Sequence, residues 1–247
     1  MTIGIVCVMH KCNKCSRNSF DIINGFISSL FKYLKDKFKL YLFDNESDEK
    51  YHVPKHSNIE YKYIRNQSLR GLYVINDGIA KAISDGCDII LIVGDDIIFN
   101  ESINKFIYII RNHIYNKVGL YGPLTNGVLN NTLQKARKAG KGIVEITNQQ
   151  KSYGILSGFC LGFTKDFYYR YRSPQGNICE ASNKWGGGER NLINRMKRDG
   201  GRVFIIKDCW IFHYKFREWK LRVKRKKKNE GNKKTKNNTR KQRVARR

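Results

Sequence analysis

The sequence predicts a single α/β domain, in which helices flank a mostly parallel sheet, followed by a basic tail. Short apolar runs rich in β-branched residues alternate with segments whose apolar residues recur at helical spacing. The chain of 247 residues is 40% hydrophobic, which is enough to bury one sizeable core. Short connections join these segments, as expected of right-handed βαβ units. Ligands of such a sheet collect at the carboxyl ends of its strands.

The first half of the chain carries the clearest elements. Residues 3–9 form a short, continuous apolar run that is typical of a buried parallel strand. The same kind of pattern predicts further strands at 38–43, 59–64 and 88–93. Apolar residues at helical spacing predict helices over 20–34, with Asn18 or Ser19 as its cap, and over 72–83.

The second half is less regular. The pattern predicts a helix near 101–112 and a strand at 118–121, followed by a polar stretch to about 150. An apolar run at 155–163, a helix from Glu189 to about Arg198 and a strand at 202–206 complete the predicted fold.

The positive charge of the chain gathers at its carboxyl end. The net charge is +27, from 48 basic and 21 acidic residues, and residues 215–247 alone hold 17 basic and 2 acidic residues. The remaining part is moderately basic, as suits an enzyme of anionic substrates. The tail, residues 216–247, is expected to be a basic helix or largely disordered segment that remains solvated, contacts an anionic membrane as a peripheral anchor, or binds a polyanion.

The cysteines and the hydropathy pattern bear on the compartment. Seven cysteines, an odd number, are spread through apolar runs, which favours a reducing environment. No signal peptide or run of about 20 apolar residues is found, so we expect a cytoplasmic protein. His10, Cys12 and Cys15 lack a second ligand pair, so no zinc site is expected there.

Acidic residues follow two of the predicted strands. Asp44 ends the strand at 38–43, and Asp95 and Asp96 follow the run Ile89–Val93 and Gly94. Adjacent carboxylates held at the end of a strand favour a divalent cation that bridges to a pyrophosphate. A solvated turn is the alternative, because Asp is common at strand ends.

A second cluster lies further along the chain. In Trp185-Gly-Gly-Gly-Glu189, the glycines allow a close backbone approach and Glu189 begins a helix, so it is either a general base or a residue that only satisfies backbone N–H groups. Trp185 is either a core residue or a platform for a sugar ring. His213, in Trp210-Ile-Phe-His-Tyr214, is either a packed core histidine or a metal ligand.

Together these motifs resemble the GT-A nucleotide-sugar glycosyltransferases, in particular the family 2 type. The resemblance covers roughly residues 2–215 and rests on Asp44, Gly71 and Asn76, Gly94-Asp95-Asp96, Ser157–Phe163 and Trp185–His213. It implies a GT-A, Rossmann-like domain over 1–215. It also implies an inverting, hexosyltransferase-type enzyme that uses Mn²⁺ or Mg²⁺ to move a sugar from a nucleoside diphosphate sugar to a hydroxyl of a glycan, lipid-linked or protein acceptor.

The resemblance also implies a role for each residue of the site. Asp44, Asp95, Arg190 and Trp185 would contact the nucleotide sugar, Asp96 and His213 would bind the metal, and Glu189 would be the catalytic base. Two departures stand out: Gly94 replaces the first Asp of an Asp-X-Asp triplet, and Arg190 follows Glu189 where an Asp is common. They keep open two alternatives, an inactive sugar-nucleotide binder and a nucleic-acid-binding protein that acts through its tail.

Overall fold

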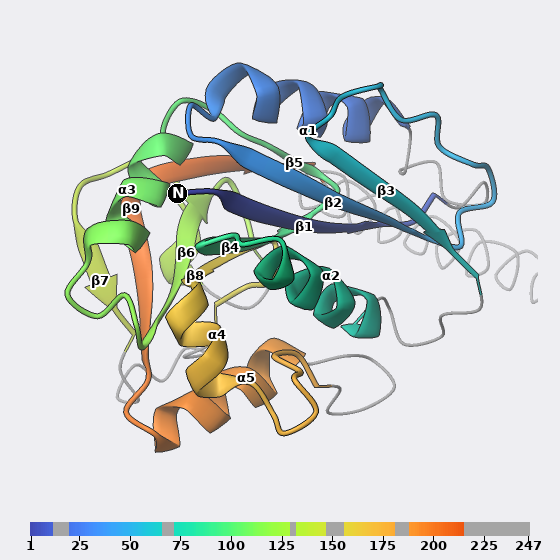
Figure 1. The fold of residues 1–247 in the computed structure, drawn as a ribbon. Coiled ribbons are helices and arrows are strands. Elements are labelled where there is room, and N and C mark those ends of the chain that lie inside the picture. The colour runs from blue at the N-terminus through green and yellow to red at the C-terminus, as the bar shows by residue number, and fades with distance from the viewer. Residues whose placement is uncertain (12–19, 66–71, 129–131, 147–155, 181–187, 215–247) are drawn as a thin grey trace, which may run out of the picture.

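The computed structural model describes residues 1–11, 20–65, 72–128, 132–146, 156–180 and 188–214. They form one nine-stranded sheet between two layers of helices (Figure 1). The strands are β1 (Ile3–Met9), β2 (Phe38–Asn45), β3 (Ile59–Ile64), β4 (Ile89–Gly94), β5 (Ile97–Ile98), β6 (Gly119–Thr125), β7 (Ile143–Glu145), β8 (Cys160–Thr164) and β9 (Arg202–His213). The helices are α1 (Phe20–Tyr33), α2 (Leu72–Ser84), α3 (Ile103–Asn112), the 3-10 turn η1 (Thr132–Gln134), α4 (Lys165–Tyr171) and α5 (Gly188–Arg198).

The strand order places a switch point beside β1. The order is β3-β2-β1-β4-β8-β6-β9-β5, with β7 paired to β9. The chain runs outward from β1 to β3 and returns on the other side of β1 as β4, and these four strands are parallel. Met9 therefore lies opposite Asp44, and Val8 lies opposite Gly94. The carboxyl ends of three strands meet at one edge, where α/β sheets bind ligands.

The second half of the sheet is mixed. β8 runs antiparallel to both β4 and β6, and β9 returns parallel to β6. The α/β fold class predicted from the sequence is confirmed, with antiparallel pairs in this half. The predicted strand at 155–163 is β8, which begins only at Cys160, and the predicted strand at 202–206 continues as β9 to His213.

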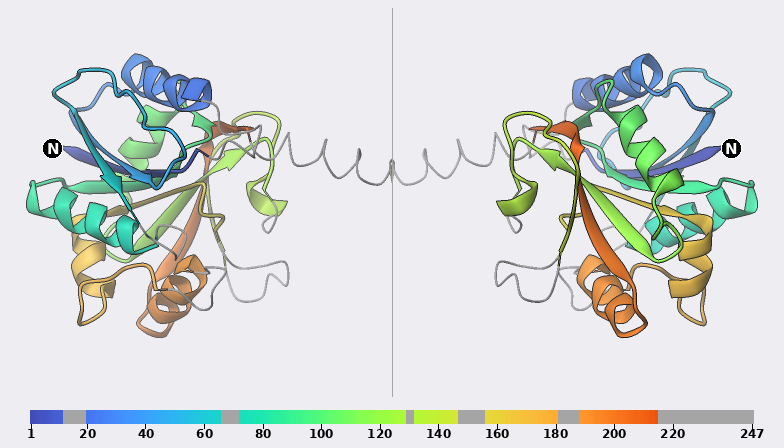
Figure 2. Two further views of the ribbon diagram at one scale, coloured as in Figure 1. Left: turned by 90° about the vertical axis from the view of Figure 1, so that its right-hand side faces the viewer. Right: turned by 90° about the vertical axis from the view of Figure 1, so that its left-hand side faces the viewer.

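Two apolar cores fix the sheet. One lies between the sheet and the layer of α1 and α3, and the other between the sheet and the layer of α2, α4 and α5, as the side views in Figure 2 show. All five cysteines in the described part are buried, as small hydrophobes would be. No described helix is long and apolar enough to cross a membrane. The cap residues Asn18 and Ser19, together with Cys12 and Cys15, lie outside the described residues.

Candidate active site

The two acidic residues after β4 lie in a tight turn that connects β4 to β5. Asp95 and Asp96 are buried, with 7% and 4% of their surface exposed. Two contacts attach this turn to the end of β9. Ile97 of β5 pairs with His213 of β9, and Tyr214 N–H donates a hydrogen bond to the Asp96 carbonyl at 2.9 Å. The short strand β5 therefore brings the last residue of β9 beside the acids that end β4.

The side chains of Asp96 and His213 meet at this point. Nε2 of His213 lies 3.2 Å from Oδ2 of Asp96, so the approach expected from the sequence is found. Nδ1 of the same ring lies 3.2 Å from the carbonyl oxygen of Gly127. A carbonyl only accepts, so Nδ1 carries the proton of that bond and Nε2 is directed at the carboxylate. Histidines that bind metals use this arrangement, because the bond from the second nitrogen fixes the tautomer and the ring orientation.

Asn126, which the sequence did not single out, holds the backbone of His213 on both sides. Its Oδ1 accepts the His213 N–H at 2.7 Å, and its Nδ2 donates to the His213 carbonyl at 3.1 Å. The ring of Phe159 also stacks on the imidazole, with centroids 5.4 Å apart. Asn126 follows directly after β6, so a polar side chain at the end of a strand was the signal that could have revealed it.

The glycine at position 94 lies against the carboxylate of Asp96. A Cβ at Gly94 would lie 2.9 Å from Oδ1 of Asp96, closer than a Cβ contact allows. Gly94 N–H also donates to the carbonyl of Phe159 at 2.9 Å, which fixes this backbone against the segment before β8. The departure from an Asp-X-Asp triplet therefore leaves the space in which the Asp96 carboxylate lies.

Asp44 is fully buried at the end of β2. One carboxylate oxygen accepts the Ser47 N–H at 3.0 Å, and the other accepts the Tyr61 hydroxyl at 3.0 Å. Burial, together with the bond to Asp44, raises the pKa of Tyr61 above its usual range, so the phenol keeps its proton and remains the donor. Between Asp44 and Ser47, Glu46 has a φ of 60°, a left-handed conformation that strains a residue with a side chain.

The loops after β1 and β2 are bonded to each other. Nδ1 of His10 lies 2.9 Å from the carbonyl oxygen of Asn45, and Lys11 N–H donates to Oγ of Ser47 at 2.7 Å. Lys11 also forms an ion pair with Glu49. The loop that Asp44 shapes is thus fixed beside the end of β1, at the edge that also carries Asp95 and Asp96.

Solved glycosyltransferase structures superpose on this chain. The structure of GalNAc-T7 with UDP, GalNAc and Mn²⁺ superposes with a TM-score of 0.58 at 13% identity, over 86% of this chain and 43% of that one. TarS of S. aureus, residues 1–349, in complex with UDP-GlcNAc superposes with a TM-score of 0.58 at 13% identity, over 86% of this chain and 58% of that one. The same protein in complex with UDP superposes with a TM-score of 0.57 at 14% identity, over 86% of this chain and 60% of that one. This chain has the GT-A fold.

The chain spans about half the length of these glycosyltransferases, between 43% and 60%. No protein-family model matches the sequence. No curated protein matches it either. The likeness is therefore one of fold, and the roles of the site residues depend on the geometry of this chain.

The glycine-rich sequence at 186–188 runs into the start of α5 at Gly188. The helix begins at Gly188, so Glu189 lies in its first turn, as the sequence predicted. Trp185 and the side chains of Glu189 and Arg190 lie outside the described residues, and their roles stay predictions. The segment before this turn is held by Asn76 of α2, whose Oδ1 accepts the Cys179 N–H at 2.9 Å.

Proposed function

We propose that the protein is a metal-dependent glycosyltransferase of the hexosyltransferase type, which moves a sugar from a nucleoside diphosphate sugar to an acceptor hydroxyl with inversion. The observation that carries the proposal is the contact between Asp96 and His213, 3.2 Å, with the ring oriented by Gly127. The GT-A fold supports it, because the GalNAc-T7 structure with this fold holds UDP and Mn²⁺.

Of Mn²⁺ and Mg²⁺, the donor set of this site fits Mn²⁺ better, because Mg²⁺ takes oxygen ligands rather than imidazole. Asp96 offers a carboxylate oxygen and His213 an imidazole nitrogen, a pair that Mn²⁺ accepts. No third His, Cys, Asp or Glu joins them among the residues whose side chains are described. An ion held by few protein ligands leaves coordination positions for diphosphate oxygens, which is how phosphate-handling enzymes bind such metals. When bound, the metal would neutralise the negative charge that develops on the leaving diphosphate.

The remaining residues have proposed roles at the same edge of the sheet. Asp44 would act on the nucleotide side, where its bonds to Ser47 and Tyr61 shape the loop after β2. Asp95 would lie near the ribose or sugar. Glu189 would take the proton from the acceptor hydroxyl, with Arg190 at the diphosphate and Trp185 against the sugar ring.

Turnover of a panel of sugar nucleotides tests the proposal. The full chain should release nucleoside diphosphate from at least one donor in the presence of Mn²⁺, and EDTA should abolish the release. Asp96→Asn should reduce it strongly, because the metal loses a charged ligand. Metal-dependent donor binding without turnover would instead identify an inactive sugar-nucleotide binder. Absence of both donor binding and turnover would contradict the proposal and leave the alternative of a nucleic-acid-binding protein.

We also propose that residues 1–215 are the catalytic domain. Residues 216–247, which lie outside the described residues, would determine where the enzyme is located. A chain that ends at Lys215 should keep its turnover of a water-soluble acceptor and lose affinity for anionic vesicles or polyanions. A folded truncation with no activity on such an acceptor would show that the tail belongs to the active site.

A further inference from the structure

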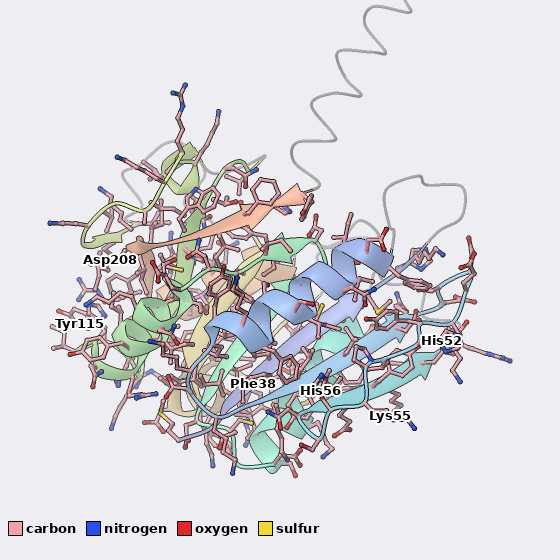
Figure 3. The ribbon with its side chains drawn as sticks, turned by 90° about the horizontal axis from the view of Figure 1, so that it is seen from above. Phe38, His52, Lys55, His56, Tyr115 and Asp208 are labelled. Carbon is pink, nitrogen blue, oxygen red and sulfur yellow. The ribbon has the colours of Figure 1, made fainter. Side chains whose placement is uncertain are left out.

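Four basic side chains gather in one short loop beside β9. The segment Lys135-Ala-Arg-Lys-Ala-Gly-Lys141, here called the basic loop, has no acidic residue, and its four basic side chains are all exposed. None of the four forms an ion pair within the described part of the chain. In Figure 3, nitrogen-tipped side chains extend outward from the yellow-green segment near Asp208.

The backbone of the basic loop is fixed at both ends. At its start, Ala136 N–H donates to the Thr125 carbonyl at 2.8 Å, and Nε1 of Trp210 donates to the Ala136 carbonyl at 3.0 Å. At its end, Gly140 N–H donates to the Lys207 carbonyl at 2.7 Å. The acidic group that contacts this end, Asp208, accepts the Gly142 N–H at 2.6 Å. The positive charges are thus presented by a preformed segment, which lowers the ordering cost of binding.

A row of aromatic side chains begins where the basic loop is attached. Trp210 and Phe212 alternate along the end of β9 and therefore face the same side, and Tyr214 follows directly after the strand. Their ring centroids are 6.3 Å apart for the first pair and 4.7 Å for the second, and all three are partly exposed. Aromatic faces offer apolar surface at which one face of a sugar ring can pack.

This surface lies on the strand that ends at the candidate metal site, on the face opposite to the His213 side chain, because successive side chains of a strand alternate. Trp210 precedes His213 by three residues, about 10 Å along an extended strand. Thr125, which holds the start of the basic loop, directly precedes the Asn126 that positions His213. A chain of sugars bound on the basic loop and the aromatic row would reach the proposed transfer site by extending past the end of β9.

Resting on the proposed function, we propose that the basic loop and the aromatic row form the acceptor surface, and that the acceptor is an anionic glycan whose sugars bear phosphate or carboxylate groups. Lysine and arginine bind such groups by charge-assisted hydrogen bonds, and the neighbouring rings accommodate sugars. The basic tail is a poor occupant of this surface, since residues 215–247 carry 17 basic and 2 acidic residues and would be repelled.

Binding of a short oligogalacturonate to the full chain, without any donor, tests the surface. Replacing Lys135, Arg137, Lys138 and Lys141 by Gln should raise its Kd at least about tenfold, because four exposed cations are lost. The matched control replaces four exposed lysines around the start of β2 and before β3, Lys32, Lys35, Lys37 and Lys55, and removes the same charge. Figure 3 shows Lys55 at the lower right of the view, away from Asp208 at the left. The control variant should bind like the unchanged protein.

Two further probes define the class of ligand. An uncharged malto-oligosaccharide should bind more weakly than the oligogalacturonate, and Phe212→Ala should weaken both sugars several-fold. Equal losses in the loop and control variants would overturn the proposal, because only net charge would then matter. A single-stranded oligonucleotide of equal charge that binds more tightly than the glycan, through the same loop, would also overturn it in favour of a nucleic-acid surface.

Glycan binding by the basic loop and hydrolysis of the donor can be measured separately, so failure of the acceptor surface is distinguished from failure of the proposed function. Hydrolysis of the donor needs no acceptor, so it should be equal in the loop variant and the unchanged protein. Loop-dependent glycan binding without any donor hydrolysis would support the surface and contradict the transfer activity. Donor hydrolysis with glycan binding that ignores the loop would support the activity and contradict the surface.

Discussion

The imidazole of His213 faces Asp96 with one nitrogen and Gly127 with the other, each at 3.2 Å. A neutral imidazole has a single N–H, and the Gly127 carbonyl, which can only accept, uses it. Nε2 therefore faces a carboxylate oxygen, and a proton on Nε2 would make the contact an ion pair. In the proposed function a divalent metal ion would take the place of that proton, with both atoms as its ligands.

Removal of either ligand should therefore weaken metal binding. We expect Asp96→Asn and His213→Gln each to raise the Kd for Mn²⁺, measured with UDP present, at least about tenfold. Asp88→Asn, at the opposite end of β4, is the control, because Asn can still accept the Thr2 N–H that Asp88 accepts at 2.9 Å. Unchanged Mn²⁺ affinity in both site variants would remove this pair from the metal site.

Asn126 should act on the metal through His213. Asn126→Ala removes both bonds to the His213 backbone, and loss of such a supporting group typically costs about 10–100-fold in metal affinity. Asn126→Asp keeps the acceptor for the His213 N–H and should recover part of the loss. Mn²⁺ affinity and the thermal midpoint are measured together. A fall in the midpoint with unchanged metal affinity would assign Asn126 a purely structural role.

Gly94→Ala should displace the Asp96 carboxylate, since the added Cβ would lie 2.9 Å from Oδ1. We expect weaker Mn²⁺ binding, and we expect the effect to disappear in an Asp96→Asn background. A double-mutant cycle measures this coupling, because residues in contact give non-additive effects. Additive losses would show that Gly94 acts on the site by another route.

The clear periodicity of the first half allowed its elements to be predicted. Strands β1, β2 and β4 are largely apolar runs that are covered on both faces, so their pattern is strong. The edge strand β3 alternates apolar and charged residues at its start and is less buried. The short elements α4, β5 and β7 were missed because two to seven residues carry too little periodicity. β9 was predicted too short, because Lys207 and Asp208 interrupt its apolar pattern at the point where its register with β6 shifts.

The register shift between β6 and β9 also explains why only part of the site could be predicted from the sequence. Asp96 and His213 could be expected to approach each other, because the resemblance assigns both to one metal ion. The contacts of Asn126 and Gly127 could not, since they depend on the register shift after Pro123, which aligns Leu124 with Trp210. The close approach of Asp96 to Gly94 is a property of one tight turn, which a sequence pattern does not reveal.

The stability of the fold should depend on His113 below neutral pH. Burial, and secondarily the charge of Arg202, lowers the pKa of His113 from its usual 6.5, and Nδ1 contacts the Tyr121 hydroxyl at 2.9 Å. Because the folded pKa lies below the unfolded one, the unfolded state binds more protons as the pH falls through 6.5. The stability that neutral His113 contributes is therefore complete above that pH and is lost below it.

His113→Gln removes this titration. We expect the loss of unfolding free energy between about pH 7.5 and about pH 5.5 to be smaller in the variant than in the unchanged protein, by urea unfolding at each pH. Other titrating groups contribute to both proteins and cancel in the comparison. A pH dependence that is identical in the two proteins would show that His113 is protonated as easily in the folded state as in the unfolded one.

Glu189 should be the general base of the transfer. Its place in the first turn of α5, after three glycines, stabilises an ionised carboxylate by a few tenths to about 1 kcal/mol. Glu189→Gln keeps the size and the hydrogen-bonding groups and removes the proton acceptor, so the transfer rate should fall by about 10²–10⁴ while the Kd of the donor stays nearly unchanged. Single-turnover rates measured with saturating donor and Mn²⁺ separate the two quantities. A variant that retains more than about a tenth of the rate, with chemistry limiting, would place the base elsewhere, and Asp95, buried beside Asp96, would be the next residue to replace.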